Sequence, residues 1–281
     1  MPKDFFACYV MFIQDEVTMK IRSIISAFTT AALLGSAAPA IAQDAPSHRF
    51  SDEEMVQLSQ GYHIGYIQSG SNRLDSYTEA GLDVLAYRLM MDTRVPISSP
   101  TVVPLDLASD ELNLFPFIYW TVTNQSDNLS EDQRARLQRY VDNGGILLID
   151  TSDISTRNDC RGLMNETIGE LDTRPFTEMP FDHTATKTFF LLQDFTSEMS
   201  RNPFCVERND EDSVESLSNI VITDIGIVRE INPQQSRVSE REREMLTRQL
   251  MNLVLYANTG DYKTDITHLP AILERMQSGP N

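Results

Sequence analysis

Short apolar runs alternate along this chain with longer segments in which apolar residues recur every three or four positions. The apolar runs predict buried strands at residues 61–68, 101–105, 114–122, 146–149 and 220–222. Residues 146–149 are apolar at every position, which indicates burial on both faces, as in a parallel sheet with helices on each side. Pro104 indicates an edge strand for its run, because proline cannot donate a hydrogen bond to a neighbouring strand.

Serines mark the starts of the predicted helices, because each is followed three residues later by glutamate or glutamine, as in a capping box. These serines are Ser51, Ser76, Ser130 and Ser239. The helix from Ser239 is the longest, and we expect it to end at residues 258–260, before a short terminal helix from residue 267. The alternation of strands and helices predicts one α/β domain over residues 51–281, a three-layer sandwich with a mostly parallel sheet.

The first residues indicate an export signal rather than part of this domain. A short basic segment at residues 19–22 precedes the apolar residues 24–34. The tripeptide ending at Ala42 then offers the small side chains that a signal peptidase requires. We therefore expect a signal peptide over residues 19–42, cleavage after Ala42 and a linker over residues 43–50. The exported chain is expected in the periplasm.

Two further expectations concern the same region. Residues 1–18 carry Asp15 and Glu16 where a positive segment is typical of a signal, so we expect translation to start at Met19. The apolar segment is too short for a membrane anchor, because a spanning helix needs roughly 20 such residues. No later apolar stretch is long enough either, so we expect no membrane span in the mature chain.

The chain is strongly acidic. It has 41 acidic residues against 23 lysines and arginines, which gives a formal net charge of −18 at pH 7. Such a charge repels the phosphate backbone of nucleic acids and anionic lipid surfaces. We therefore expect no nucleic-acid partner.

The cysteines provide evidence on the compartment and on a cross-link. Cys8 lies in the segment that is predicted to be removed, which leaves Cys160 and Cys205 as an even pair. In an oxidising compartment such thiols tend to join, so we predict a disulfide between them. The alternative is two separate thiols, because the sequence does not show that the two β-carbons meet.

Open parallel sheets bind ligands beyond the carboxyl ends of their strands. At such positions the chain has Tyr119 and the tetrapeptide Asp150-Thr151-Ser152-Asp153. Two carboxylates and two hydroxyls could hold a sugar, a cation or an attacking water, and the alternative is a turn that caps the next helix. Tyr119 and Trp120 could stack on a sugar, although aromatic residues in such a run are more often part of the core.

Asp182 and His183 are the second polar pair, because a histidine beside a carboxylate can serve as a base or a ligand. Ser152, His183 and an aspartate would make a hydrolytic triad. The sequence argues against it, because no Gly-x-Ser-x-Gly turn exposes Ser152, and the pattern favours a structural His183. The candidate pocket therefore comprises Tyr119, Asp150, Thr151, Ser152, Asp153, Asp182 and His183.

No metal or cofactor is predicted. The four histidines are scattered without an H-E-x-x-H or H-x-H spacing. The acidic residues 210–215 lack the glycine that an EF-hand loop needs at its bend, so a solvated acidic loop is the better interpretation. No glycine-rich loop opens a helix to bind phosphate.

Several segments together resemble the domain-of-unknown-function family 4159, over residues 62 to 276 approximately. They are Ser76-x-x-Glu79-Ala80-Gly81-Leu82, Asp110-Glu111-Leu112, Phe115-Pro116-Phe117-Ile118-Tyr119-Trp120, Leu137-x-x-Tyr140-x-x-x-Gly144-Gly145, Pro180-x-Asp182-His183 and Asn252-Leu253-Val254-Leu255-Tyr256-Ala257. The resemblance implies a fold similar to flavodoxin and to class I glutamine amidotransferases. In many alphaproteobacteria the domain ends a larger membrane protein that begins with an aerotolerance-related, BatA-like region.

The resemblance transfers no catalytic residue, because the family has no assigned reaction. Amidotransferases carry a nucleophilic cysteine on a glycine-flanked turn after a buried strand, whereas residues 150–153 contain neither cysteine nor glycine. We therefore expect a non-catalytic periplasmic protein that binds an unknown small molecule or an envelope protein on a degenerate amidotransferase-like fold. The alternative is a hydrolase of a cell-envelope sugar or amide that uses Asp150 or Asp153 with His183.

Overall fold

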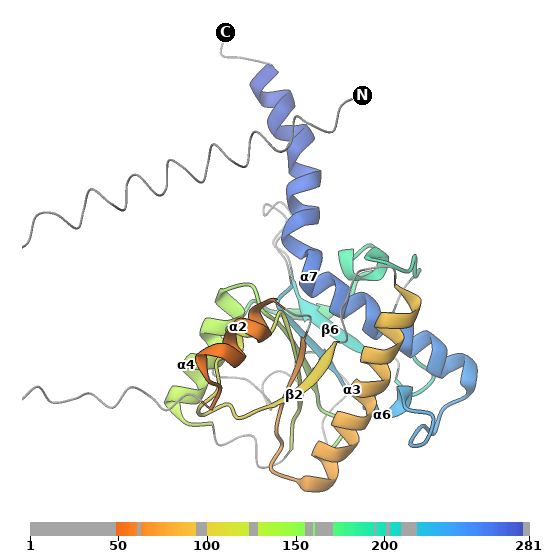
Figure 1. The fold of residues 1–281 in the computed structure, drawn as a ribbon. Helices are drawn as coiled ribbons and strands as arrows, with labels where there is room; N and C mark the ends of the chain where they lie inside the picture. The colour runs from red at the N-terminus through yellow and green to blue at the C-terminus, as the bar shows by residue number, and fades with distance from the viewer. Residues whose placement is uncertain are drawn as a thin grey trace, which may run out of the picture. The chain divides into compact units, whose positions relative to one another are not determined.

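The computed structural model describes residues 49–60, 63–93, 100–123, 129–154, 160, 171–193, 195–200, 203–208 and 218–277 (Figure 1). The predicted signal peptide, the cleavage site after Ala42, residues 43–48 of the linker and the acidic residues 210–215 lie outside these ranges. Within them, no helix is both long enough and apolar enough to cross a membrane.

A seven-stranded sheet lies at the centre of the described residues, in the order β2-β1-β3-β4-β7-β6-β5 (Figure 1). The strands are β1 (His63–Ile67), β2 (Thr101–Leu105), β3 (Phe117–Thr121), β4 (Ile146–Asp150), β5 (Phe176–Glu178), β6 (Phe204–Glu207) and β7 (Ile220–Thr223). The first five strands of that order pair in parallel, and β6 pairs antiparallel with both β7 and β5. The predicted mostly parallel α/β sheet is confirmed, with Pro104 on the edge strand β2.

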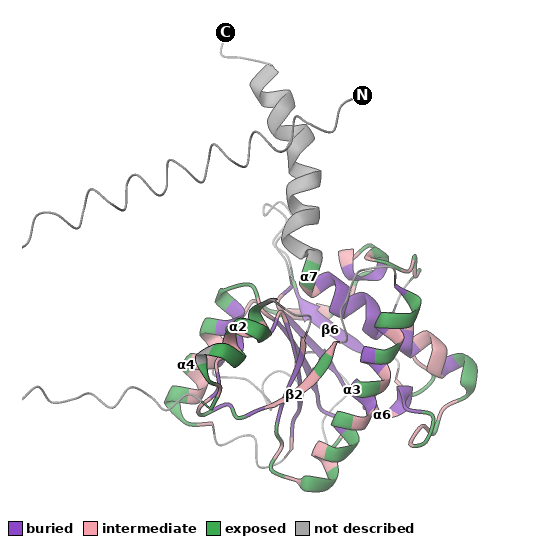
Figure 2. Cartoon of the chain, in the orientation of Figure 1, coloured by how far each residue is buried: buried purple, intermediate pink, exposed green. Residues whose placement is uncertain are grey.

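Helices cover both faces of this sheet. One face carries α3 (Asn72–Asp92), α6 (Ile227–Ile231) and α7 (Glu240–Gln277), and the other carries α4 (Glu131–Asp142) and α2 (Asp52–Gln60). Short 3-10 turns form at η1 (Leu112–Leu114) and η3 (Thr184–Lys187). Every residue of β4 is buried, and Figure 2 shows buried residues through the middle of the sheet. Burial on both faces explains why residues 146–149 are apolar without alternation.

The predicted helix starts are confirmed in part. At α4 the hydroxyl of Ser130 accepts from the N–H of Gln133, and the Gln133 side chain accepts from the N–H of Ser130. The start predicted at Ser76 is wrong, because α3 begins at Asn72 with Ser71 as its N-cap. Gly70, with φ of 78°, turns the chain directly after β1, so the helix starts one turn earlier.

The end predicted for the last helix is also wrong. The hydroxyl of Ser239 does cap α7, because it accepts from the N–H of Glu242. The helix then continues past residues 258–260 to Gln277 as one element. A glycine weakens a helix by only about 1 kcal/mol relative to alanine, so Gly260 alone is a weak stop signal.

The predicted disulfide is confirmed. Cys205 lies in the middle of β6 and is fully buried, and its sulfur is bonded to that of Cys160. The two α-carbons are 5.5 Å apart, within the ordinary span of a disulfide. The bond therefore ties the segment after β4 to the antiparallel side of the sheet.

Gly81 allows α3 to pack closely against α6. A β-carbon at this position would lie 2.1 Å from the carbonyl oxygen of Val228, which is backbone and cannot rotate away. We expect Gly81→Ala to lower the free energy of unfolding by about 1 to 3 kcal/mol, because the two helices must separate. Urea denaturation measures this, with the exposed Glu79→Ala on the same helix as the control. A Gly81→Ala chain as stable as wild type would contradict the close contact.

Candidate functional site

Asp150 lies at the carboxyl end of β4 and is fully buried. Its Oδ2 accepts a hydrogen bond of 2.5 Å from the hydroxyl of Tyr119, which is on the neighbouring strand β3. Its Oδ1 accepts from the backbone N–H groups of Ser152 at 2.9 Å and Gly226 at 3.3 Å. Both oxygens of this carboxylate are therefore already bonded within the protein.

Burial controls the protonation of this pair. Burial raises the pKa of Asp150, and the hydrogen bonds from Tyr119 and Ser152 oppose that rise. Burial, together with the charge of Asp150, raises the pKa of Tyr119 well above its ordinary value. Tyr119 thus keeps its proton and donates a hydrogen bond to the carboxylate, so neither group is a free base or nucleophile.

Gly226 brings the third donor to Asp150. It follows β7, precedes α6 and has the left-handed φ of 65°. A β-carbon there would meet the Nη2 of Arg229 at 2.7 Å. Sequence reasoning missed this residue, although a glycine shortly after an apolar strand was an available signal.

The tetrapeptide that follows β4 forms a turn. The N–H and the hydroxyl of Thr151 both donate to the carbonyl oxygen of Thr223. The N–H of Ser152 bonds back to the side chain of Asp150, as in an Asx-turn. Thr151 is buried, Ser152 is partly exposed and Asp153 is exposed.

Little space remains at this edge of the sheet. A cleft of about 20 Å³ lies between Tyr119, Ser152 and Asp153 and the facing residues Thr78 and Arg229 of α3 and α6. That is room for roughly one water molecule, and no sugar ring fits. Trp120 offers no stacking surface, because it is buried against the opposite face of the sheet from Tyr119.

A second carboxylate lies close to Asp150. Asp224 follows β7 and accepts from the hydroxyl of Ser200 at 3.0 Å. Burial raises its pKa, and the charge of Asp150 adds to the rise. Its other oxygen is buried without a partner. Among the residues that the structure describes, no group of three or more histidine, cysteine or carboxylate side chains is arranged to hold a metal ion.

His183 lies at the amino edge of the sheet, where the amino ends of the parallel strands lie, whereas Asp150 lies at the opposite, carboxyl edge. Its Nδ1 accepts from the N–H of Ala185, and its Nε2 therefore carries the proton and donates to the hydroxyl of Ser218 at 3.1 Å. Ser218 precedes the start of β7, whereas Asp150 pairs with Thr223 at the end of that strand. The two sites are therefore about 16 Å apart along the strand direction.

The structure thus divides the residues of the predicted pocket. It brings Tyr119, Asp150, Thr151, Ser152 and Asp153 together at one edge and places the Asp182-His183 pair at the other, with Asp182 exposed. Ser152 and His183 form no triad. The reason is topological, since β5 runs in the same direction as β4 and His183 follows β5 at the opposite, amino edge.

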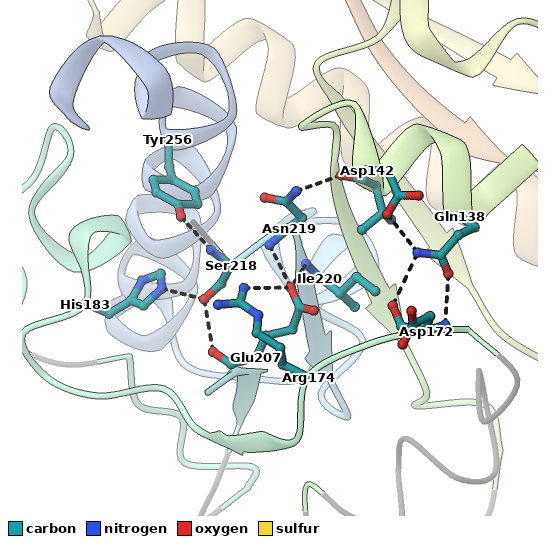
Figure 3. A network of polar contacts seen from close by, with 11 residues as sticks. Gln138, Asp142, Asp172, Arg174, His183, Glu207, Ser218, Asn219, Ile220 and Tyr256 are labelled. Carbon is teal, nitrogen blue, oxygen red and sulfur yellow. Dashed lines mark hydrogen bonds and ion pairs between the residues drawn. The ribbon is translucent and has the colours of Figure 1, made fainter. Parts of the chain in front are cut away.

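Ser218 joins several elements around His183. Its hydroxyl donates to the carbonyl oxygen of Glu207, and its N–H donates to the hydroxyl of Tyr256 on α7. The Glu207 carboxylate accepts from the N–H of Asn219 at 3.0 Å and lies 3.4 Å from the guanidinium of Arg174 (Figure 3). This network fastens β6, β7, η3 and α7 at the amino edge.

The surroundings of His183 predict a pH dependence of stability. Burial lowers the pKa of His183 from 6.5 to about 4, although the charge of Asp182 acts in the opposite direction. Between these two values the unfolded chain binds a proton that the folded chain does not, so stability falls as the pH falls. The loss is roughly 3 kcal/mol once the pH reaches 4. Urea denaturation at pH 7 and at pH 4 measures it.

His183→Gln should flatten this pH dependence, whereas His63→Gln, which leaves the His183 network in place, should keep it. Identical slopes for the wild type and His183→Gln between pH 7 and pH 4 would contradict the assignment. The comparison between variants also removes the contributions of the carboxylates, because those are common to all three chains.

A search of curated proteins finds no match to this chain. One family model does match, over residues 63–257, and it carries the description "Domain of unknown function (DUF4159)". That range begins with β1 and includes Asp150, His183 and Tyr256. Because the match covers most of the chain, this protein belongs to the DUF4159 family.

Proposed function

We propose that this chain is a periplasmic, non-catalytic binding or envelope-assembly domain on a degenerate amidotransferase-like fold. The observation that carries the proposal is the filled crevice at the carboxyl ends of the strands. Asp150 has both oxygens bonded to Tyr119, Ser152 and Gly226, and the remaining cleft holds about 20 Å³. A site of this kind favours a macromolecular partner that contacts the surface over a small ligand in the crevice.

The strand order supports the finer fold assignment within this proposal. The parallel strands follow the order β2-β1-β3-β4-β7, which corresponds to the order 2-1-3-4-5 of flavodoxin-like sheets. Ligands in such sheets bind where the strand order reverses, here outside β1 and β3. In this chain α3 covers that position, and the hydroxyls of Thr78 and Thr121 are 3.2 Å apart.

Two features support the periplasmic part. The basic segment, the apolar stretch and the small residues before Ala42 are typical of a cleavable signal. The disulfide between Cys160 and Cys205 suits an oxidising compartment. Both fit a protein that works outside the cytoplasm.

A thermal-shift screen of the purified chain against envelope sugars, muropeptides and divalent cations tests the proposal. A ligand that binds only the native state must raise the melting temperature. We expect no compound to raise it in a manner that depends on residues 150–153. A reproducible shift that Ser152→Ala abolishes, or turnover of a muropeptide by the wild type, would overturn the non-catalytic proposal.

A further inference from the structure

Residues 181–188, which we call the η3 segment, follow β5, pack against α7 and carry His183 to the amino edge of the sheet. Ala185 and Thr186 in the turn η3 are fully buried. Phe181, at the start of the segment, is 71% exposed. The segment therefore covers part of the core with its middle and presents its first residue to solvent.

Both ends of the η3 segment are fixed by groups that do not titrate. Before it, the N–H of Met179 donates to the carbonyl oxygen of Phe204 on β6 at 3.0 Å. After it, the buried side chain of Asn252 on α7 accepts from the N–H groups of Phe189 and Phe190 and donates to the carbonyl oxygen of Phe190. These two attachments do not depend on pH, so they can act as hinges.

The middle of the segment is held through the imidazole of His183. Its Nδ1 accepts from the N–H of Ala185 at 3.2 Å, which caps η3. Its Nε2 donates to the hydroxyl of Ser218 at 3.1 Å, which connects the segment to the start of β7 (Figure 3). Because a backbone N–H is always a donor, this arrangement requires Nδ1 to carry no proton.

A second proton on the imidazole is incompatible with this cap. Both ring nitrogens of a histidine cation are donors, so a proton on Nδ1 would face the N–H of Ala185 with no acceptor between them. Burial also disfavours the cation, which lowers the pKa of His183 to about 4. The closed segment therefore accommodates the neutral imidazole, whereas an open segment accommodates both forms.

The charged and titratable groups around the imidazole do not stabilise its cation enough to offset burial. Asp182 in the same segment is exposed, and its charge raises the pKa of the imidazole less than burial lowers it. From α7, Tyr256 presents its ring at 5.6 Å between centroids. From β6, Glu207 offers its backbone carbonyl to Ser218, while its carboxylate binds Arg174 (Figure 3).

From this arrangement we propose that the η3 segment is an acid-sensitive flap, which leaves the amino edge when Nδ1 of His183 takes a proton from solvent, while the sheet stays folded. The flap turns about the attachments at Met179 and Phe189. Its opening exposes Ala185 and Thr186, so the surface at the amino edge depends on pH. This inference goes beyond the proposed binding function and does not rest on it.

Hydrogen exchange of the purified chain at pH 7 and pH 4, corrected for the intrinsic effect of pH on exchange, tests the flap. The open fraction of residues 183–188 should rise about a hundredfold at pH 4, because the open segment binds the proton with a pKa of 6.5 and the closed segment with a pKa of about 4. Residues 146–150 of β4 should stay protected over the same exchange time, since they exchange only on global unfolding.

His183→Gln is the matched variant, because a glutamine side chain offers an amide oxygen to the N–H of Ala185 and does not titrate. Its residues 183–188 should exchange with the same open fraction at both pH values, whatever that fraction is. His63→Gln removes a different imidazole and should keep the rise seen in the wild type. The ratio between the two pH values is the quantity compared among the three chains.

Three results would overturn the flap. One is an unchanged open fraction of residues 183–188 in the wild type at pH 4. The second is loss of protection in residues 183–188 and 146–150 together, which shows global unfolding. The third is a rise that persists in His183→Gln, which assigns the proton to another group. None of these results bears on the proposed binding function, which the thermal-shift screen tests separately.

Discussion

Replacing both Cys160 and Cys205 by serine should lower the free energy of unfolding by about 4 kcal/mol, because the bond closes a loop with a sequence separation of 45 residues. The loop-closure entropy that the disulfide removes from the unfolded chain accounts for this magnitude. The buried position of Cys205 in the middle of β6 adds to the loss, since a serine hydroxyl there needs a hydrogen-bond partner. Urea denaturation without reductant measures the effect.

Cys8→Ser is the matched control, because Cys8 lies outside the pair and within the segment that is predicted to be removed. It should leave the unfolding midpoint unchanged. A reductant should shift the wild-type chain towards the double variant and leave the double variant itself unaffected. A wild-type midpoint that is insensitive to reductant under denaturing conditions would contradict a stabilising disulfide.

Asp150→Ala should lower the free energy of unfolding by about 3 kcal/mol. The substitution leaves the hydroxyl of Tyr119 and the N–H groups of Ser152 and Gly226 without their acceptor in a buried site. Relief of the buried charge offsets part of the loss, since burial raises the pKa of Asp150. Urea denaturation at neutral pH measures the difference from wild type.

Asp153→Ala tests whether the effect belongs to Asp150. Asp153 lies on the same turn but is exposed, so its loss should change stability by less than about 0.5 kcal/mol. Asp150→Asn keeps an acceptor for the two N–H groups and should fall between the two alanine variants. An Asp150→Ala chain as stable as Asp153→Ala would refute the structural role of the carboxylate.

The central elements of the fold could be predicted because their patterns are local. The apolar run of β4 predicts a buried strand, and the capping box at Ser130 predicts a helix start, each from a few consecutive residues. The strands β5 and β6 could not be predicted in the same way. They are short, they lie in a loosely patterned region, and they join the sheet only through antiparallel pairing of β6 with β7 and of β5 with β6.

Only one part of the candidate site, the part around Asp150, could be predicted from the sequence. Strand ends follow from strand positions, so Tyr119 and Asp150 could be placed at the same edge. The location of His183 depends on the route of the chain between β4 and β7, which no local pattern encodes. Its partners Ser218 and Tyr256 are 35 and about 70 residues away in sequence. The hydrogen-bond network around His183 at the amino edge therefore could not be predicted from the sequence.

The outer side of α3 illustrates a third case. Tyr87 and Met91 are exposed on a helix whose buried residues include Leu82, Leu85 and Leu89. From the sequence alone such outer residues only weaken the amphipathic pattern. That Tyr87 shares a groove with Arg241 and Arg243 becomes apparent only when α3 and α7 are placed together.

The most direct test of the central claim is complementation in a host that lacks the gene. The host, grown under cell-envelope stress, receives the wild-type chain, the double variant Ser152→Ala and Asp153→Ala, or an empty vector. If the strand-end turn is structural and the protein acts by binding, the double variant restores survival as fully as the wild type. Failure of the double variant at an equal exported level would contradict the account, because it would place the function at the carboxyl edge of the sheet.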